Sequence, residues 1–259
     1  MSEKTGKLTG KTAVVTGCAG GLGSVLAKMM AEEGANVVAC DIIEDSLNKQ
    51  MKPLIDAGLS ITPAKLDITV EDDWQRVMKL AVDTYKKVDI VVNNAAIRCE
   101  KDILNCSLAE FEKVVKINET GTFLGIKYGA LEMDKTGGGS IVNISSIGGI
   151  VSGDADGADV GYSASKGGVR TMTKHAAINL ASRNIRVNSI HPGGIMTPML
   201  KAVFDATPAL WDRVKVSSPL APHINDPADI AHGVIFLASD DSRTITGVEL
   251  PIDCGYLAH

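Results

Sequence analysis

The chain has 259 residues, 45% of them hydrophobic and 22% charged, which suits one large α/β domain or two small ones with an aliphatic core. Its net charge of −5, without a basic stripe, argues against a nucleic-acid partner. The five cysteines form no CxxC and the five histidines have no metal-ligand spacing, so we expect reduced thiols, no disulfide scaffold and no metal site.

The amino-terminal segment is polar. Residues 1–7 lack the apolar core of a signal peptide, and no apolar run in the chain approaches the ~18 residues that a membrane-spanning helix requires. We therefore expect a cytoplasmic protein with no membrane partner.

A glycine-rich turn separates the first expected strand from the first expected helix. Residues 12–16 form a short apolar run typical of a buried strand, and apolar residues recur at helical spacing from Leu22 onward. Between them, Gly17, Gly21 and Gly23 allow a tight turn, and the helix N-terminus offers unpaired N–H groups to a pyrophosphate. The spacing differs from the commoner GxGxxG, and such a turn taken alone is structural about as often as it is functional.

The second expected strand, residues 36–40, ends at Asp41, 18 residues after Gly23. A carboxylate at this strand end can bind both ribose hydroxyls of an adenosine and repel a 2′-phosphate. Neither the glycine turn nor the residues directly after Asp41 include Lys or Arg, so the sequence favours NAD over NADP. The competing interpretation is that Asp41 caps a helix N-terminus.

Strands and helices alternate along the rest of the chain, which predicts βαβ units and a parallel sheet covered on both faces. The further expected strands cover 61–66, 88–92, 140–146, 185–190 and 248–252, and the further expected helices cover 70–86, 107–132, 161–183 and 226–238. Asp67 and Ile68 end the third strand, where a side chain could meet an adenine. Asn93, after the fourth strand, could line a cofactor, but the local pattern favours a turn.

Tyr162 and Lys166 stand four residues apart, so on a helix their side chains share one face. An ammonium there favours the phenolate and lowers a tyrosine pKa that starts near ~10, which lets the phenol exchange a proton with an alcohol or ketone. An isolated YxxxK is more often an ordinary surface helix. Ser146 ends the fifth strand, at the edge where open parallel sheets bind ligands. Asn118 lies inside the helix expected over 107–132, where an asparagine is usually exposed or bonded to its own backbone.

The segment 196–222 breaks the periodicity and contains Pro198, Pro208 and Pro219, so we expect a long loop. It is rich in aliphatic side chains and includes Trp211. Such a segment could cover a substrate as a lid, or it could simply pack onto the body of the domain.

The chain resembles the short-chain dehydrogenase/reductase family over nearly its whole length. The resemblance rests on an ordered set of motifs, namely Thr16-Gly17…Gly21…Gly23, Asp67, Asn93-Asn94-Ala95, Asn118, Ser146, Tyr162…Lys166 and Pro192-Gly193. It implies a Rossmann-type, doubly wound α/β fold with a seven-stranded parallel sheet, and with no linker or internal repeat we expect one domain over residues 1–259.

The resemblance also implies roles for individual residues. Tyr162 would be the general acid/base, Ser146 would bond the substrate oxygen, Lys166 would lower the Tyr162 pKa and bind the nicotinamide ribose, and Asn118 would hold a water of a proton relay. Thr197 and the backbone near Ile195 would bind the nicotinamide carboxamide. The implied NAD-binding residues are Gly17, Gly21, Leu22, Gly23, Asp41, Asp67, Ile68, Asn94, Tyr162, Lys166, Ile195 and Thr197.

Three positions depart from the family pattern. Ala96 replaces the last glycine of NNAG, so we expect its backbone to approach the cofactor less closely, whereas Cys254 in place of a glycine of DGG is expected to affect packing alone. Ser146 and Tyr162 are separated by 15 residues, more than is common, including an acidic stretch at 154–159 that we expect to be a solvated loop; the alternative is an edge of the substrate entrance. Ser145 could substitute for Ser146, but the Ser-x-x-Gly pattern favours Ser146.

We therefore expect an NAD-dependent oxidoreductase acting on an apolar secondary alcohol or ketone that is cyclic, of the alicyclic-alcohol or hydroxysteroid type. One alternative is a 3-oxoacyl-carrier-protein-type ketoreductase, against which Asp41 argues because biosynthetic reductases usually use NADPH. Another is a non-catalytic dinucleotide-binding regulator. Family members commonly form homotetramers through the helices expected here at 107–132 and 161–183, although core packing explains the apolar content of these helices equally well.

Overall fold

Seven parallel strands form a single sheet in the order β3-β2-β1-β4-β5-β6-β7. The computed structural model describes residues 6–151 and 159–258. The strands are β1 (Thr12–Thr16), β2 (Asn36–Asp41), β3 (Ile61–Lys65), β4 (Ile90–Asn93), β5 (Gly139–Ile144), β6 (Ile185–Pro192) and β7 (Glu249–Ile252). This sheet confirms the predicted doubly wound α/β fold, whose order reverses between β1 and β4.

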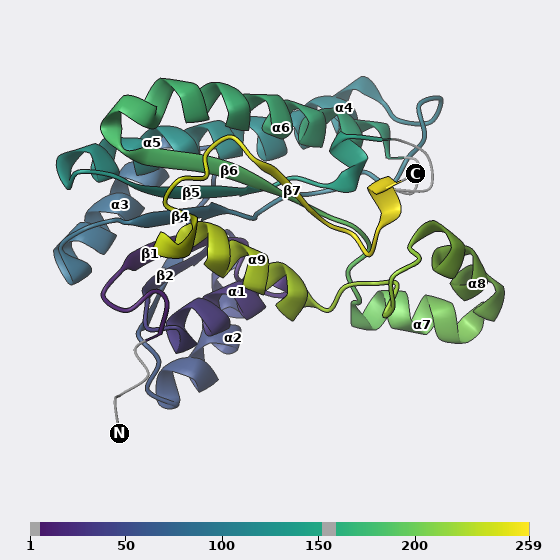
Figure 1. Ribbon diagram of the computed structural model, residues 1–259, viewed down its shortest axis with the longest axis horizontal. Coiled ribbons are helices and arrows are strands. Elements are labelled where there is room, and N and C mark those ends of the chain that lie inside the picture. The colour runs from purple at the N-terminus through teal and green to yellow at the C-terminus, as the bar shows by residue number, and fades with distance from the viewer. Residues whose placement is uncertain (1–5, 152–158, 259) are drawn as a thin grey trace.

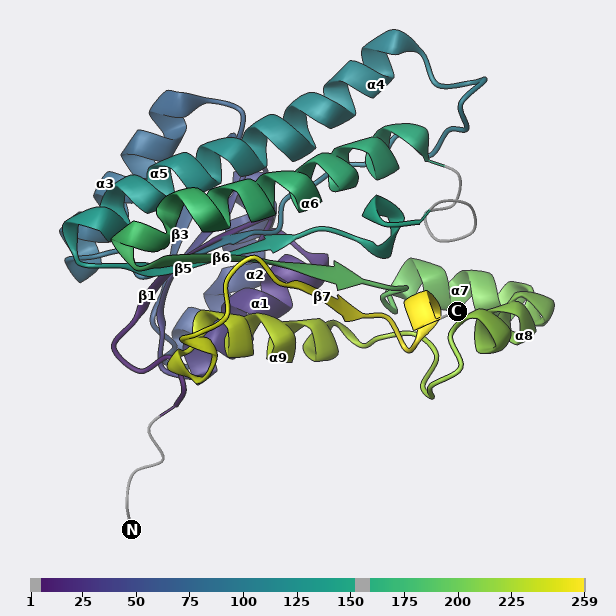
Figure 2. The same cartoon turned by 45° about the horizontal axis from the view of Figure 1, so that its top comes forward.

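Helices cover both faces of the sheet. They are α1 (Gly21–Glu32), α2 (Glu44–Asp56), α3 (Glu71–Tyr85), α4 (Leu108–Val115), α5 (Gly121–Lys135), α6 (Val160–Leu180), α7 (Pro198–Ala206), α8 (Pro208–Ser217) and α9 (Pro227–Ala238). In Figures 1 and 2, α1, α2 and α9 lie on one face and α3, α4, α5 and α6 on the other, while α7 and α8 lie beyond the end of β6 and β7.

Two hydrophobic cores fill the spaces between the sheet and these helix layers. Val15 and Val37 face the core under α1 and α9, whereas their neighbours Val14 and Val38 face the core under α3 and α5. Successive residues of a strand point to opposite faces, so both faces can be buried only if the strands are apolar throughout. That requirement explains the continuous apolar runs in the sequence.

Three segments differ from the expected secondary structure. The helix expected over 107–132 consists of α4 and α5 joined by a π-helical turn at Lys116–Thr120. The segment 196–222, expected to be an irregular loop, forms mainly α7 and α8. No expected element covers α2, because its sequence is largely polar and has Pro53 in its interior.

None of the helices in the described ranges combines the length and the apolar character that a bilayer span requires.

Candidate active site

A groove of about 510 Å³ lies where the glycine turn meets the ends of β2, β3 and β4. Among the residues that line it are seven of the predicted cofactor-binding residues, namely Gly17, Leu22, Gly23, Asp41, Asp67, Ile68 and Asn94. They come together because the carboxyl ends of parallel strands meet at one edge of a sheet. Gly21, which begins α1, does not line this groove.

Glycine is required at three positions of the glycine turn, either by the backbone conformation or by a close contact. Gly17 and Gly21 have φ values of +78° and +53°, in the left-handed region that favours glycine. A Cβ atom on Gly23 would lie 1.9 Å from the carbonyl oxygen of Gly17, so α1 can pack against the turn only without a side chain there. Gly20, the N-cap of α1, has no side chain to cap the helix, which leaves the first-turn N–H groups for an anion. These features fit a dinucleotide pyrophosphate.

Asp41 lines the groove and also binds the backbone of the glycine turn. Its carboxylate accepts hydrogen bonds from Ala19 N at 2.9 Å and from Ile43 N at 3.0 Å. The N-cap of α2 is Ile43, so the competing interpretation of Asp41 as a helix N-cap is wrong. In the described residues, the lining of the groove contains no Lys or Arg.

The two asparagines at the end of β4, Asn93 and Asn94, have different hydrogen-bond partners. Asn94 donates to Thr16 O at 2.9 Å and so links the end of β4 to the glycine turn. Asn93 is buried and donates to Asn143 Oδ1 on β5 at 2.8 Å. The turn expected at Asn93 is wrong, because this residue is the last one of β4 and bridges two strands.

At the end of the groove that β3 forms, Asp67 accepts hydrogen bonds from the backbone and the hydroxyl of Thr69 at 2.9 and 2.8 Å. Ile68 is buried, and its Cδ1 atom lies 2.4 Å from where a Cβ on Gly121 would stand. The groove therefore has one polar and one apolar wall at this end.

Tyr162 and Lys166 lie on α6, with Lys166 Nζ 5.5 Å from the centre of the Tyr162 ring. Lys166 is buried and donates to Ile144 O, at the end of β5, at 2.6 Å. Burial lowers the pKa of Lys166 to about 8, because the charged ammonium has lost most of its hydration. The helix spacing thus brings the predicted pair together, and the buried lysine anchors it to the sheet edge.

Ser145 and Ser146, at the same sheet edge, have separate partners. Ser145 Oγ donates to Lys166 O at 2.9 Å, which ties β5 to α6. Ser146 Oγ accepts a hydrogen bond from Gly148 N at 3.0 Å, and Ser146 O lies 3.1 Å from His191 Nδ1. The Ser145 hydroxyl proton is thus used in the link to α6, which favours Ser146 over Ser145 as the serine that meets a substrate.

Asn118 lies in the π-helical turn and is only 1% exposed. Its Nδ2 donates to Ile97 O at 3.0 Å and to Ser165 Oγ at 2.9 Å, while its Oδ1 accepts from Ile97 N at 2.9 Å. The expectation of an exposed or self-bonded asparagine is wrong, because the side chain connects the loop after β4 to α6. π turns of this kind are frequent at functional sites.

Ile195 and Thr197 follow β6 at the same edge of the sheet. Ile195 forms an isolated β-bridge with Asn225, and Thr197 Oγ1 accepts a hydrogen bond from Leu200 N at 3.2 Å. Both lie outside the lining of the groove around Asp41.

A second cavity of about 730 Å³ is lined by Ile147, directly after Ser146, and mainly by residues of α7 and α8, which include the charged Asp212 and Arg213 beside apolar side chains. Leu200, Phe204 and Leu210 belong to it, as do His223 and Tyr256, which the sequence interpretation missed. They come from separate parts of the chain and carry no local motif. Trp211 does not line this cavity; its ring packs edge-on against Phe204 at 5.1 Å and His223 at 6.1 Å.

The acidic stretch 154–159 falls largely on residues 152–158, outside the described residues. Asp159 is described and is fully buried, so the expectation of a solvated loop is wrong for this residue. Its carboxylate caps α6 by accepting a hydrogen bond from Tyr162 N at 2.9 Å. An Asp directly before a helical pattern is an N-cap signal, and that signal could have identified it.

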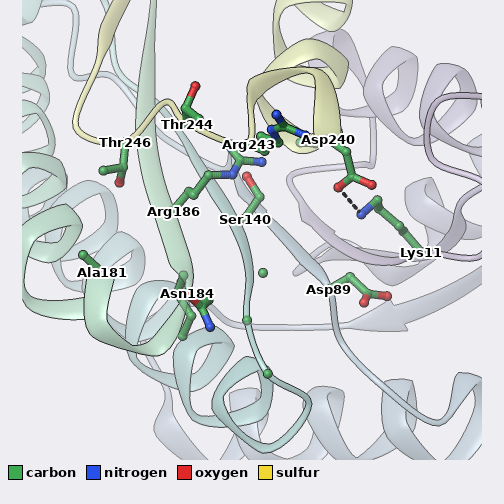
Figure 3. Close-up of a pocket in the computed structure, with 15 residues that line it drawn as sticks. Lys11, Asp89, Ser140, Ala181, Asn184, Arg186, Asp240, Arg243, Thr244 and Thr246 are labelled. Atoms are coloured by element: carbon green, nitrogen blue, oxygen red, sulfur yellow. Dashed lines mark hydrogen bonds and ion pairs between the residues drawn. The ribbon is translucent and has the colours of Figure 1, made fainter.

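A third cavity, of about 450 Å³, lies at the opposite end of the sheet, near the first residues of β5 and β6 (Figure 3). Figure 3 shows both signs of charge around it, with an ion pair of 2.8 Å between Lys11 and Asp240. None of the predicted site residues is among the residues that line it.

Comparisons with known proteins agree with this arrangement. Residues 17–257 match the profile of a family described as enoyl-(acyl carrier protein) reductase. The chain is 38% identical to a 2,5-dichloro-2,5-cyclohexadiene-1,4-diol dehydrogenase of Sphingobium indicum, over 96% of this chain and 97% of that protein. It is 36% identical to a cyclopentanol dehydrogenase of Comamonas, over 98% and 100% of the two chains.

It is also 37% identical to an NADP-dependent (R)-specific alcohol dehydrogenase of Lentilactobacillus kefiri, over 98% of this chain and 99% of that one. Among solved structures, a Burkholderia xenovorans protein described as a short-chain dehydrogenase/reductase superposes with a TM-score of 0.90. Its sequence identity is 35%, over 98% of this chain and 99% of that one.

Proposed function

The chain belongs to the short-chain dehydrogenase/reductase family, and we propose that it transfers a hydride between NAD(H) and an apolar, cyclic secondary alcohol or ketone. The observation that carries this proposal is the position of the apolar cavity. It starts at Ile147, one residue after the Ser146 hydroxyl, at the sheet edge that also holds Lys166. Relatives named for cyclic alcohols support the same substrate class.

The groove around Gly17, Gly23 and Asp41 would hold the dinucleotide, which supplies or accepts the hydride when bound. The chain's own residues handle the proton. In oxidation, Tyr162 Oη takes the proton of the substrate hydroxyl as the hydride leaves the carbinol carbon, and in reduction it returns that proton to the carbonyl oxygen. Ser146 Oγ orients the substrate oxygen, and the Lys166 ammonium favours the phenolate.

We propose NAD as the cofactor because a carboxylate in the lining of the groove, at the end of β2, would repel the 2′-phosphate of NADP. Family membership alone leaves this choice open, since one relative is NADP-dependent. In Asp41→Asn, which keeps the shape and removes the charge, the ratio of kcat/KM with NAD to that with NADP should fall roughly 10- to 100-fold. Steady-state kinetics with both cofactors measures it, with Asp45→Asn in the first turn of α2 as the matched control. A wild-type enzyme that uses NADP better than NAD would contradict the proposal.

The cavity also predicts a substrate ranking. Cyclohexanol buries three more carbon atoms than propan-2-ol, and at ~0.8 kcal/mol per CH₂ its kcat/KM should be higher by roughly 50-fold. Inositol, a ring of the same size with a hydroxyl on every carbon, should be a poor substrate because the cavity offers its hydroxyls fewer hydrogen-bond partners than water does. A panel containing these compounds, a hydroxysteroid and a 3-oxoacyl thioester measures the preference. Preference for polyols or for the thioester would defeat the substrate proposal, and no turnover of any member would favour the regulator alternative.

We also propose a homotetramer assembled through α5 and α6. Their outward surface carries exposed apolar side chains, including Phe123, Leu131 and Ile178, with exposed fractions of 49%, 52% and 79%. An apolar cavity of about 360 Å³ lies between the two helices. Large exposed apolar surfaces of this kind are typical of protein–protein interfaces.

A further inference from the structure

Tyr162 has two cations beside its ring. Lys166 Nζ lies 5.5 Å from the ring centre, and Arg98 Cζ, from the loop between β4 and α4, lies 4.7 Å above it. Neither a motif nor the proposed function assigns a role to Arg98. Its position over the aromatic face is that of a cation–π contact, in which the electron-rich face of the ring attracts the positive charge.

Arg98 is held at this position by a buried carboxylate. Its Nε lies 3.7 Å from Asp159 Oδ2, and Asp159 is fully buried while 41% of the Arg98 side chain is exposed. Burial alone would raise the pKa of the Asp159 carboxyl, but hydrogen bonds from Glu100 N, Tyr162 N and the backbone and thiol of Cys99 outweigh burial and lower the pKa. Asp159 therefore stays ionised, and it fixes both the loop that carries Arg98 and the first turn of α6.

Two further titratable groups at this edge of the sheet, His191 and Cys99, favour their neutral forms at neutral pH. His191, whose Nδ1 faces Ser146 O, has a pKa lowered by burial, which favours the neutral ring. The Cys99 thiol has a pKa raised to about 11 by burial and by its hydrogen bond to Asp159, so it is neutral as well. Lys166, Arg98 and Asp159 thus place two cations and one anion next to Tyr162.

We propose that Arg98 is a positioning residue that stabilises the phenolate form of Tyr162 and thereby sets the pH range in which the enzyme oxidises alcohols. This inference rests on the proposed function, because it takes Tyr162 as the proton acceptor. A cation close to the ring favours the phenolate because the negative charge of the deprotonated phenol spreads over the aromatic system.

The two cations act over different pH ranges. Burial brings the pKa of Lys166 to about 8, so this ammonium loses its charge in the alkaline range where alcohol oxidation is favoured. The guanidinium of Arg98 keeps its charge at every working pH. Arg98 therefore keeps a positive charge near the phenol at the alkaline pH values at which Lys166 loses its own charge.

The test is the pH dependence of kcat/KM for oxidation of the best alcohol of the panel, with saturating NAD, between pH 6 and 10.5. In Arg98→Met the apparent pKa of the acidic limb should rise by about one pH unit relative to the wild type. The direction of this shift is the same whether the acidic limb reports the pKa of the phenol or that of the Lys166 ammonium. Loss of a neighbouring cation raises the pKa of the phenol and also that of the Lys166 ammonium.

Two matched variants separate charge from structure. Arg98→Lys keeps the positive charge and should restore the position of the limb, whereas Arg98→Gln removes the charge, keeps polar contacts and should shift the limb as Arg98→Met does. Arg243→Met removes an exposed arginine at the opposite end of the sheet (Figure 3) and should leave the profile unchanged. NADH binding measured by fluorescence verifies that each variant is folded.

Three results are decisive. The inference is overturned if both Arg98→Met and Arg98→Gln keep the wild-type apparent pKa of the acidic limb and change only the maximal kcat/KM. The proposed function would still stand. A shift in Arg98→Lys equal to that in Arg98→Met also overturns the inference, because the charge would then be irrelevant. If Tyr162→Phe retains activity, the proposed function itself fails, and that outcome is separate from any result with Arg98.

Discussion

Replacing Tyr162 with phenylalanine should lower kcat for oxidation of a cyclic alcohol by roughly 1,000-fold. The substitution removes only the hydroxyl, so the ring under Arg98 and the packing of α6 remain. Without Oη, no group of α6 at this position can accept the substrate proton while the hydride leaves. The affinity for NADH should change little, since only the hydroxyl is lost and the groove around Asp41 keeps its whole lining. Stopped-flow or steady-state absorbance of NADH measures the rate.

Tyr128→Phe is the matched control for this experiment. Tyr128 lies on α5, and its hydroxyl donates to Glu71 Oε2 at 2.5 Å on the surface of α3, away from the sheet edge that holds the site. Loss of that hydroxyl should leave kcat unchanged. Equal losses in the two variants would mean that the effect of Tyr162→Phe comes from disturbed packing and not from proton transfer.

Alanine substitutions along the glycine turn should destabilise the fold in a graded order, with Gly23→Ala by roughly 3 kcal/mol or more. A Cβ at Gly23 would lie 1.9 Å from the carbonyl oxygen of Gly17 and 2.8 Å from Asn94 Nδ2, so the turn and α1 would have to separate. Gly21→Ala should cost about 1 kcal/mol, because φ is +53° but nothing lies within 4 Å of the new atom. Gly20→Ala should be nearly neutral, since its φ of 171° is extended and its surroundings are open.

Urea unfolding of the three variants measures this order. The same proteins tested for NADH binding give a second reading, because α1 presents its N-terminal N–H groups only while it packs against the turn. Gly23→Ala should bind NADH weakest of the three. Equal stability of Gly20→Ala and Gly23→Ala would show that the turn moves freely, and it would remove the structural reason for glycine at position 23.

The sheet could be predicted from the sequence because its inner strands β1, β4 and β5, together with β2, contain apolar runs followed by a recognisable break. Asp41 could be placed for the same reason, since the residue that ends a parallel strand lies at the edge of the sheet where ligands bind. The helices α7 and α8 could not be predicted, because a proline within a segment usually indicates that a helix is interrupted. Pro198 and Pro208 begin helices, a position where the missing N–H of proline is harmless.

The hydrogen-bond partners and neighbouring charges of the site residues could not be predicted from the sequence, for a different physical reason. Asn118 bonds to Ile97 and Ser165, which are 21 and 47 residues away in the chain, and a periodicity of 3.6 gives no information on such contacts. Arg98 is similar, because only the fold brings its loop over Tyr162. Sequence motifs identify the reacting groups, whereas the charges around them depend on the tertiary arrangement.

The π turn at Lys116–Thr120 makes chain length itself a constraint in this part of the molecule. Each residue turns an α-helix by about 100°, so removing one residue here would rotate everything that follows by that angle. Met133, now buried against the sheet, would swing toward water, and Asn118 would leave the loop it connects. Natural or engineered variants can therefore exchange side chains between 108 and 135 far more easily than they can gain or lose a residue there.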